Sequence, residues 1–217
     1  LKERLRELEN ILEKKSDELA EIRKEYSKQL EQKIIQGLKD LNFLDVNFAI
    51  DFRKKKNYTD NGTDDIQYLI STNPGETLKP LGQIVSGGEL SRIMLALKAI
   101  LADRDEIETL IFDEIDTGIS GRTAQKVSEK MAVIGQHHQV LCITHLPQIA
   151  AMADSHFEIE KHLQGTETIT QIHVLKENDS IRELARLLGG AEITPAVLEN
   201  AKEMKELAQK QKNTRFK

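Results

Sequence analysis

Two neighbouring carboxylates, Asp113 and Glu114, directly follow the apolar stretch 109–112, which reads TLIF. In open α/β sheets, ligands bind at the carboxyl ends of the strands. One carboxylate in that place can hold Mg²⁺, usually through water, and the next can orient or deprotonate an attacking water. The alternative is a strand that simply ends in two solvated acids, so other groups must support a hydrolytic centre.

A second apolar stretch, 139–143, is followed by Thr144 and His145. If this stretch is a strand of the same sheet, His145 is presented at the same edge as Asp113 and Glu114. An imidazole in that position can bond a terminal phosphate. Taken alone, a histidine after an apolar strand is more often structural, so the two stretches have to be weighed together.

Ser86, Gly87 and Gly88 precede a run of helix formers that begins at Glu89. Two adjacent glycines are an unfavourable helix start, because glycine loses the most backbone entropy when it is ordered. They are useful where backbone N–H groups must approach a ligand closely, and the usual ligand at a helix N-terminus is an anion. The stretch therefore predicts an anion-binding helix start.

These groups need strands and helices to position them, and the apolar pattern predicts both. Apolar residues at 93, 97 and 101 indicate a buried helix face after the glycines. Strands that alternate with helices in the middle of the chain indicate an α/β fold with largely parallel central strands. Further helices are predicted at 122–136, 146–153, 180–190 and 194–209, and a hairpin from 156–162 and 168–176.

Residues 1–33 carry a 4-3 alternation of apolar side chains, interrupted at Lys15, with both charge signs between them. This is typical of one strand of a coiled-coil arm, whose partner strand must come from elsewhere; the alternative is a solvated amphipathic helix. Residues 44–52 then predict a half-buried strand, 53–65 a charged, turn-rich loop, and 66–72 a second strand. We therefore divide the chain into an arm, 1–33, and a globular part, 34–217.

Composition narrows the class of protein. The chain has 217 residues, 39% of them hydrophobic, and a formal net charge of −5. It is therefore not a polycation built to coat nucleic acid, and any DNA contact would be local. A single cysteine, Cys142, excludes an internal disulfide. No apolar run reaches the length of a membrane span, so no membrane partner is expected.

The order of these features resembles the head of the ATP-binding-cassette ATPases, in the branch that includes the SMC proteins. VSGGE at 85–89 is similar to the signature motif of that family, LIFDE at 110–114 to its Walker B motif, and ITH at 143–145 to its H-loop. All three occur in the family's order and at compatible separations. The resemblance implies ATP and Mg²⁺ as cofactors and a homodimer of heads that share the bound nucleotides.

The resemblance also implies a role for each matching residue. Asp113 would hold Mg²⁺ through water, Glu114 would polarise the hydrolytic water, and His145 would sense the γ-phosphate. Asp116 and Ser120 fall in the D-loop, which serves the bound nucleotide. Ser120 stands where the wider family has an aspartate, which puts communication between the paired sites through that residue in doubt.

From the opposite side of the dimer, the signature motif would act in trans. The resemblance implies that Ser86, Gly87 and Gly88 contact the γ-phosphate of the ATP held by a second head.

Longer stretches, at 71–98, 112–121, 144–157 and 183–190, resemble the RecN family of bacterial DNA double-strand-break repair proteins. The resemblance implies an ATPase of recombinational repair, located in the bacterial cytoplasm at the nucleoid. Broken DNA ends and a recombinase would be its partners.

One expected motif is missing, because no stretch of the form G-x-x-x-x-G-K-[ST], the Walker A phosphate loop, occurs in the sequence. We therefore expect the C-terminal half of a head, inactive alone, with an exposed apolar surface where its own N-terminal Walker A lobe would pack. The alternatives are a coiled-coil tethering module without hydrolysis and the nucleotide-binding subunit of a transporter. The arm at 1–33 argues against the transporter.

Overall fold

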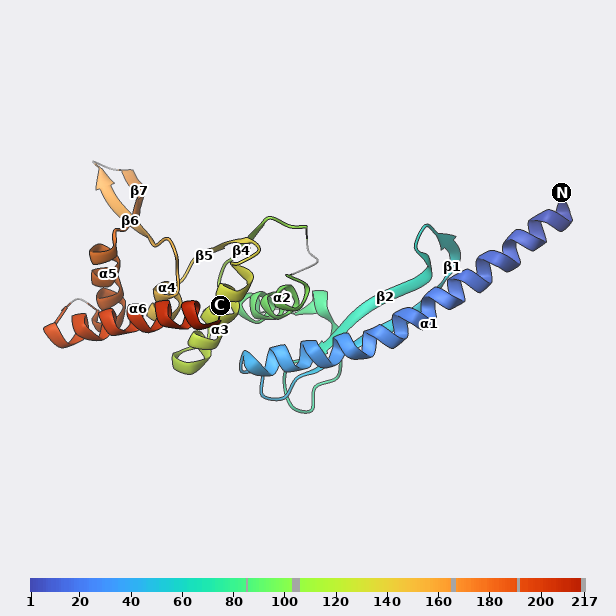
Figure 1. The fold of residues 1–217 in the computed structure, drawn as a ribbon, viewed down its shortest axis with the longest axis horizontal. Coiled ribbons are helices and arrows are strands. Elements are labelled where there is room, and N and C mark those ends of the chain that lie inside the picture. Colours follow the sequence, from blue (N-terminus) through green and yellow to red (C-terminus); the bar gives the residue numbers. More distant parts are fainter. Residues whose placement is uncertain (85, 103–105, 165–166, 191, 216–217) are drawn as a thin grey trace. The chain divides into compact units, whose positions relative to one another are not determined.

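The computed structural model describes residues 1–84, 86–102, 106–164, 167–190 and 192–215. The chain divides into two compact units, Leu1–Ser86 and Gly87–Lys217 (Figure 1). Across these described residues, no helix is both long enough and apolar enough to span a membrane.

The first unit is built on one long helix, α1 (Lys2–Asp40), which lies alongside a hairpin (Figure 1). The hairpin consists of β1 (Asn47–Thr59) and β2 (Gly62–Ser71), and β3 (Lys79–Pro80) pairs antiparallel with β2. A short 3-10 helix, η1 (Leu81–Gln83), follows. The predicted strands at 44–52 and 66–72 correspond to parts of β1 and β2 in a three-stranded sheet of order β1-β2-β3, although β1 starts only at Asn47 and β2 ends at Ser71.

Helix α1 has two different apolar stripes. The buried side chains of its second half include Ser27 and the core residues Ile34 and Leu38. The predicted heptad positions are offset from that stripe by one residue, roughly 100° around the helix. They are exposed at Leu5, Leu8, Leu12, Ile22 and Tyr26. The coiled-coil arm therefore stays a prediction, and its boundary at residue 33 lies inside a helix that continues to Asp40.

The loop predicted at 53–65 is wrong, because most of it belongs to the hairpin. Strand β1 continues to Thr59 and β2 begins at Gly62, whose φ of 83° suits glycine at the turn. Opposite charges face each other in the register, Arg53 with Asp65 and Lys54 with Asp64. The ion pairs themselves form diagonally across the hairpin, Lys55 with Asp65 at 3.7 Å, and with α1, Lys54 with Asp17 and Arg23 with Asp64. Such charge pairs support a hairpin that the apolar pattern alone does not predict.

The second unit contains a parallel strand pair between helices. β4 (Thr109–Phe112) pairs in parallel with β5 (Gln139–Cys142), and Phe112 lies opposite Cys142. The parallel arrangement predicted for the centre of the chain is thus present, while the other two sheets are antiparallel. The remaining elements are α2 (Gly87–Leu101), α3 (Gly121–Ile134), α4 (Pro147–Ala151), β6 (Phe157–Gln164), β7 (Glu167–Val174), α5 (Glu177–Gly189) and α6 (Pro195–Arg215).

The two faces of the β4–β5 pair differ sharply in burial. Leu110 and Phe112 are buried on one face. On the other face Ile111 is 69% exposed, Leu141 45% and, just past the strand, Ile143 56%. Parallel sheets in proteins are normally covered on both faces. The described part of this unit therefore covers one face of its parallel sheet and leaves an apolar surface on the other.

Candidate functional site

Two of the predicted groups meet at one edge of the β4–β5 pair. Because the strands are parallel and Phe112 lies opposite Cys142, both strands end at the same edge. Asp113 follows directly after β4, and His145 follows β5 by three residues. Both side chains are exposed there, as is that of Glu114.

The turn after β4 holds Glu114 in an unusual backbone conformation. Its φ is 56°, in the left-handed region, which costs a residue with a Cβ about 1–2 kcal/mol. The Asp113 carboxylate supports this turn, since its Oδ1 accepts a hydrogen bond from the Glu114 N–H at 2.9 Å. Backbone strain of this kind persists only where the surroundings enforce it, and it concentrates at functional sites.

The glycine-rich start of α2 packs directly onto that turn. A Cβ at Gly88 would lie 3.0 Å from the Glu114 carbonyl oxygen and 3.0 Å from the Thr117 Cβ. A Cβ at Gly87 would collide with the Glu114 carboxylate. One turn further on, Ser91 Oγ donates to the Asp113 carbonyl oxygen at 2.8 Å. The glycines thus allow a close approach within the chain itself, which is a reason for their presence independent of the predicted anion binding.

Arg92 ties the same helix to the loop after β4. It is only 8% exposed, and its Nη1 donates to the carbonyl oxygens of Thr117 at 2.8 Å and Ile115 at 3.3 Å. Burial lowers the pKa of the guanidinium, while the nearby Glu89 charge opposes that shift. The guanidinium and the two carbonyl groups have lost their water, so breaking these bonds would leave them without partners at a free-energy cost. The arginine therefore holds the loop in one conformation.

Asp116 and His145 join the ends of the two strands. Asp116 is 4% exposed, and its Oδ2 accepts hydrogen bonds from Thr144 Oγ1 at 2.6 Å and from the His145 backbone N–H at 2.9 Å. The His145 ring lies over the same oxygen, with Nδ1 at 3.0 Å. The predicted D-loop residue Asp116 is therefore buried beneath His145, whereas Ser120, at the N-cap of α3, is exposed.

Sequence reasoning missed two contributors to this site, Arg92 and Thr144. The available signal for Arg92 was a cation directly before the apolar stretch 93–97, in a helix predicted to be buried. Thr144 stands in the quoted motif, but only its contact with Asp116, across 28 positions of sequence, shows what it does.

The site could hold Mg²⁺ with one carboxylate, Asp113, only if phosphates and water supplied the remaining ligands. In the part of the chain that the structure describes, no three or more His, Cys, Asp or Glu side chains cluster as a metal site. Mg²⁺ is commonly held by one or two carboxylates together with substrate phosphates and water. Asp113, exposed at the strand edge, suits that arrangement.

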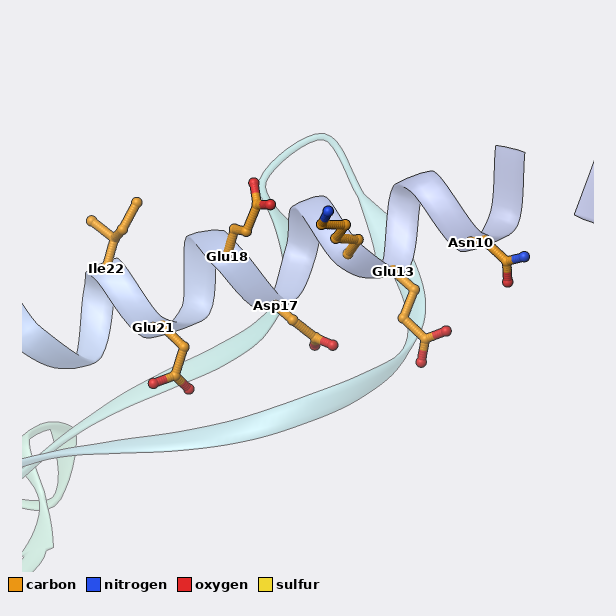
Figure 2. Close-up of a pocket in the computed structure, with 7 residues that line it drawn as sticks. Asn10, Glu13, Asp17, Glu18, Glu21 and Ile22 are labelled. Carbon is orange, nitrogen blue, oxygen red and sulfur yellow. The ribbon is translucent and has the colours of Figure 1, made fainter. Parts of the chain in front are cut away.

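Two hollows in the described part of the surface lie away from these residues. Figure 2 shows the larger one, of about 790 Å³, with Asn10, Glu13, Asp17 and Glu21 in a row along one side of α1. Three of its four acids are in ion pairs: Asp17 with Lys54 at 3.0 Å, Glu18 with Lys15 at 2.7 Å and Glu21 with Lys24 at 3.0 Å. We interpret it as a solvated helix surface. A second hollow, of about 340 Å³, lies among α3, α4 and α6.

Cys142, the one cysteine of the chain, should be a slow nucleophile in the folded protein. Burial, assisted by the Asp116 and Asp113 charges, raises the pKa of its thiol from 9.0 to about 12. The thiolate is the reactive form, so alkylation by iodoacetamide at pH 8 should be at least about 10-fold slower than in the urea-denatured chain. Because the pKa is raised on folding, this thiol also contributes stability below pH 9 that is lost as the pH rises towards 12. Equal alkylation rates for the folded and denatured chain would contradict this burial.

Comparison with known proteins gives a consistent result. No protein-family model matches the chain. It is 44% identical to the DNA repair protein RecN of Halalkalibacterium halodurans over 201 residues, which are 91% of this chain and 36% of that protein. It is 39% identical to RecN of Bacillus subtilis over 211 residues, 90% of this chain and 37% of that protein. The chain thus spans about a third of the length of the relatives it matches.

Solved structures support the fold. The Smc head domain of Pyrococcus yayanosii, with a coiled coil and joint, matches 84% of this chain and 33% of its own, with a TM-score of 0.56 and 18% identity. The Smc head domain of Pyrococcus furiosus, with an extended coiled coil, matches 85% of this chain and 43% of its own, with a TM-score of 0.52 and 16% identity. With the fold of an SMC-type head and this level of identity to RecN proteins, the chain belongs to the RecN family.

Proposed function

We propose that this chain is the signature, Walker B and H-loop half of an ATP-hydrolysing head that acts in recombinational repair of DNA double-strand breaks. One observation carries the proposal. The acids after β4 and the histidine after β5 share one sheet edge, and the glycine-rich start of α2 packs on the turn after β4. That arrangement suits hydrolysis of a phosphoanhydride at the edge.

Each group has a distinct role in the proposed reaction. Asp113 would hold Mg²⁺ through water, which would neutralise charge on the phosphates. Glu114 would polarise the attacking water, and His145 would contact the γ-phosphate. Ser86, Gly87 and Gly88, with Ser120 of the D-loop, would serve the ATP of a second head, because a helix N-terminus attracts phosphate oxygens.

The exposed face of the β4–β5 pair is the place where we propose that a partner lobe packs. Ile111, Leu141 and Ile143 form an apolar surface on a parallel sheet that is covered on its other side only. A Walker A lobe packed there would bury this surface and supply the phosphate loop that the sequence lacks. ATP would then close two heads and hydrolysis would release them, changing how the arms hold DNA ends. We place the protein in the bacterial cytoplasm at the nucleoid, with a recombinase as a further partner.

The test is Mg-ATP hydrolysis by this chain alone and after mixing with a separately produced RecN Walker A lobe. We expect no measurable turnover by the chain alone, because it lacks a β,γ-phosphate cradle, and turnover on mixing. An Ile111→Glu variant should prevent the complex and the turnover together, since it charges the apolar face, while Glu108→Gln should change neither. Hydrolysis by the chain alone would contradict the divided site.

An inactive complex has a specific meaning. If the two lobes form a stable complex that binds ATP without hydrolysing it, the tethering module becomes the better account. The exposed heptad positions of α1, which would bind a second helix, would then carry the function.

A further inference from the structure

The buried carboxylate of Asp116 is contacted by groups from Thr144 and His145, which lie nearly thirty residues further along the chain. Three groups converge on one oxygen, Oδ2: Thr144 Oγ1 at 2.6 Å, the His145 N–H at 2.9 Å and His145 Nδ1 at 3.0 Å. The carboxylate is 5% exposed, whereas the His145 side chain is 73% exposed. The buried Asp116 carboxylate thus contacts the Nδ1 side of the His145 ring, while most of the His145 side chain is exposed to solvent.

The contact favours a proton on one ring nitrogen. His145 Nδ1 lies 3.0 Å from Oδ2 as an ion-pair contact, and a lone pair on that nitrogen would face the negative charge of the carboxylate, so a protonated Nδ1 suits this position. Nε2 is then the nitrogen that the ring presents outward. A free imidazole exchanges between its two tautomers. In a folded protein, the tautomer that prevails is set by the hydrogen-bond partners of the two ring nitrogens.

The ring is held in position as well as in tautomer. The backbone N–H of His145 donates to Oδ2, and its ring Nδ1 lies 3.0 Å from the same oxygen, so backbone and ring both contact one atom. Thr144 Oγ1 also accepts from the Leu146 N–H at 3.0 Å, which fixes the residues on both sides of His145. Asp116 in turn lies in the loop that Arg92 holds through the Ile115 and Thr117 carbonyls.

We propose that Asp116 is a positioning residue that acts through His145, holding the imidazole as its Nδ1–H tautomer with Nε2 aimed at the terminal phosphate. The proposal rests on the proposed function, and it gives Asp116 a task different from direct contact with nucleotide. A carboxylate that orients a histidine typically supports activity by a factor of 10 or more.

The first experiment needs no activity. Nitrogen-15 spectra of the labelled chain report which imidazole nitrogen is protonated, and His145→Gln identifies the His145 signals among the six histidines. We expect Nδ1–H in the wild type and a shift towards Nε2–H in Asp116→Asn. Asp154→Asn, at an exposed carboxylate that pairs with Lys212 instead, should leave the His145 tautomer unchanged. A wild-type His145 that is mainly the Nε2–H tautomer would overturn the proposal, even if Asp116→Asn does not fold.

The second experiment is a double-mutant cycle in the complex with a Walker A lobe. Asp116→Asn should lower kcat about 10- to 100-fold with a smaller change in KM, and it should add little to the loss already caused by His145→Gln. Losses that multiply would mean that Asp116 acts elsewhere. If the wild-type complex hydrolyses no ATP, the proposed function fails, and the tautomer spectra still decide whether Asp116 positions His145.

Discussion

Replacing Glu114 by Gln should lower ATP hydrolysis by the assembled head about 10²- to 10⁴-fold, the usual contribution of a general base. The amide has nearly the shape of the carboxylate but cannot take a proton from water. The strained turn should remain, because the bond from the Glu114 N–H to Asp113 Oδ1 is made by the backbone. Steady-state phosphate release measures the effect.

ATP binding should survive the same substitution. We expect Glu114→Gln to bind Mg-ATP with wild-type affinity and to accumulate ATP-bound head dimers, which light scattering can follow, since closing precedes hydrolysis in the proposed cycle. Glu108→Gln is the matched control, because Glu108 is an exposed carboxylate next to the opposite end of β4. A Glu114→Gln head that still hydrolyses ATP within about threefold of the wild type would remove Glu114 from the mechanism.

A glycine at position 114 tests separately whether the Glu114 side chain is needed for catalysis and whether its backbone conformation costs stability. Glu114 adopts a φ of 56°, which glycine tolerates without the Cβ penalty. Glu114→Gly should therefore be inactive without being less stable. A marked loss of stability would show that the Glu114 side chain is needed for folding rather than for hydrolysis.

Replacing Arg92 by Ala should lower the free energy of unfolding of the second unit by about 2–4 kcal/mol, which is large for a single substitution. The change removes the donor to the Ile115 and Thr117 carbonyls and leaves a cavity between α2 and the loop after β4. Two carbonyl groups then lose their partner in a place where Arg92 itself is only 8% exposed. Urea denaturation followed by circular dichroism measures the difference.

Two variants sharpen this test. Arg92→Lys keeps the charge but replaces a planar fork of donors by a single ammonium, so we expect an intermediate loss. Arg122→Ala is the matched control, because Arg122 is exposed in the first turn of α3 and should change stability by less than about 0.5 kcal/mol. If Arg92→Ala and Arg122→Ala are equally stable, the buried hydrogen bonds do not hold the loop.

The errors made from sequence share a cause. The charged segment 53–65 reads as a loop because its residues lack an apolar alternation, yet Arg53 and Lys54 face Asp65 and Asp64 across a hairpin. Arg92 interrupts an otherwise apolar helix face for a partner 25 positions away, the Thr117 carbonyl. Both depend on which distant residues become neighbours, and local propensity does not carry that information.

The amino-acid sequence by itself determined the order of the motifs, the strands that end in Asp113 and His145, the glycine-started helix and the membership of the family, because these rest on local periodicity and on residue types at fixed spacings. Only the tertiary structure decided that Asp116 lies under His145 rather than on the surface, and that one face of the parallel pair is left apolar and exposed. Burial and hydrogen-bond partners are properties of the packed chain, since they arise when segments far apart in sequence exclude water from each other.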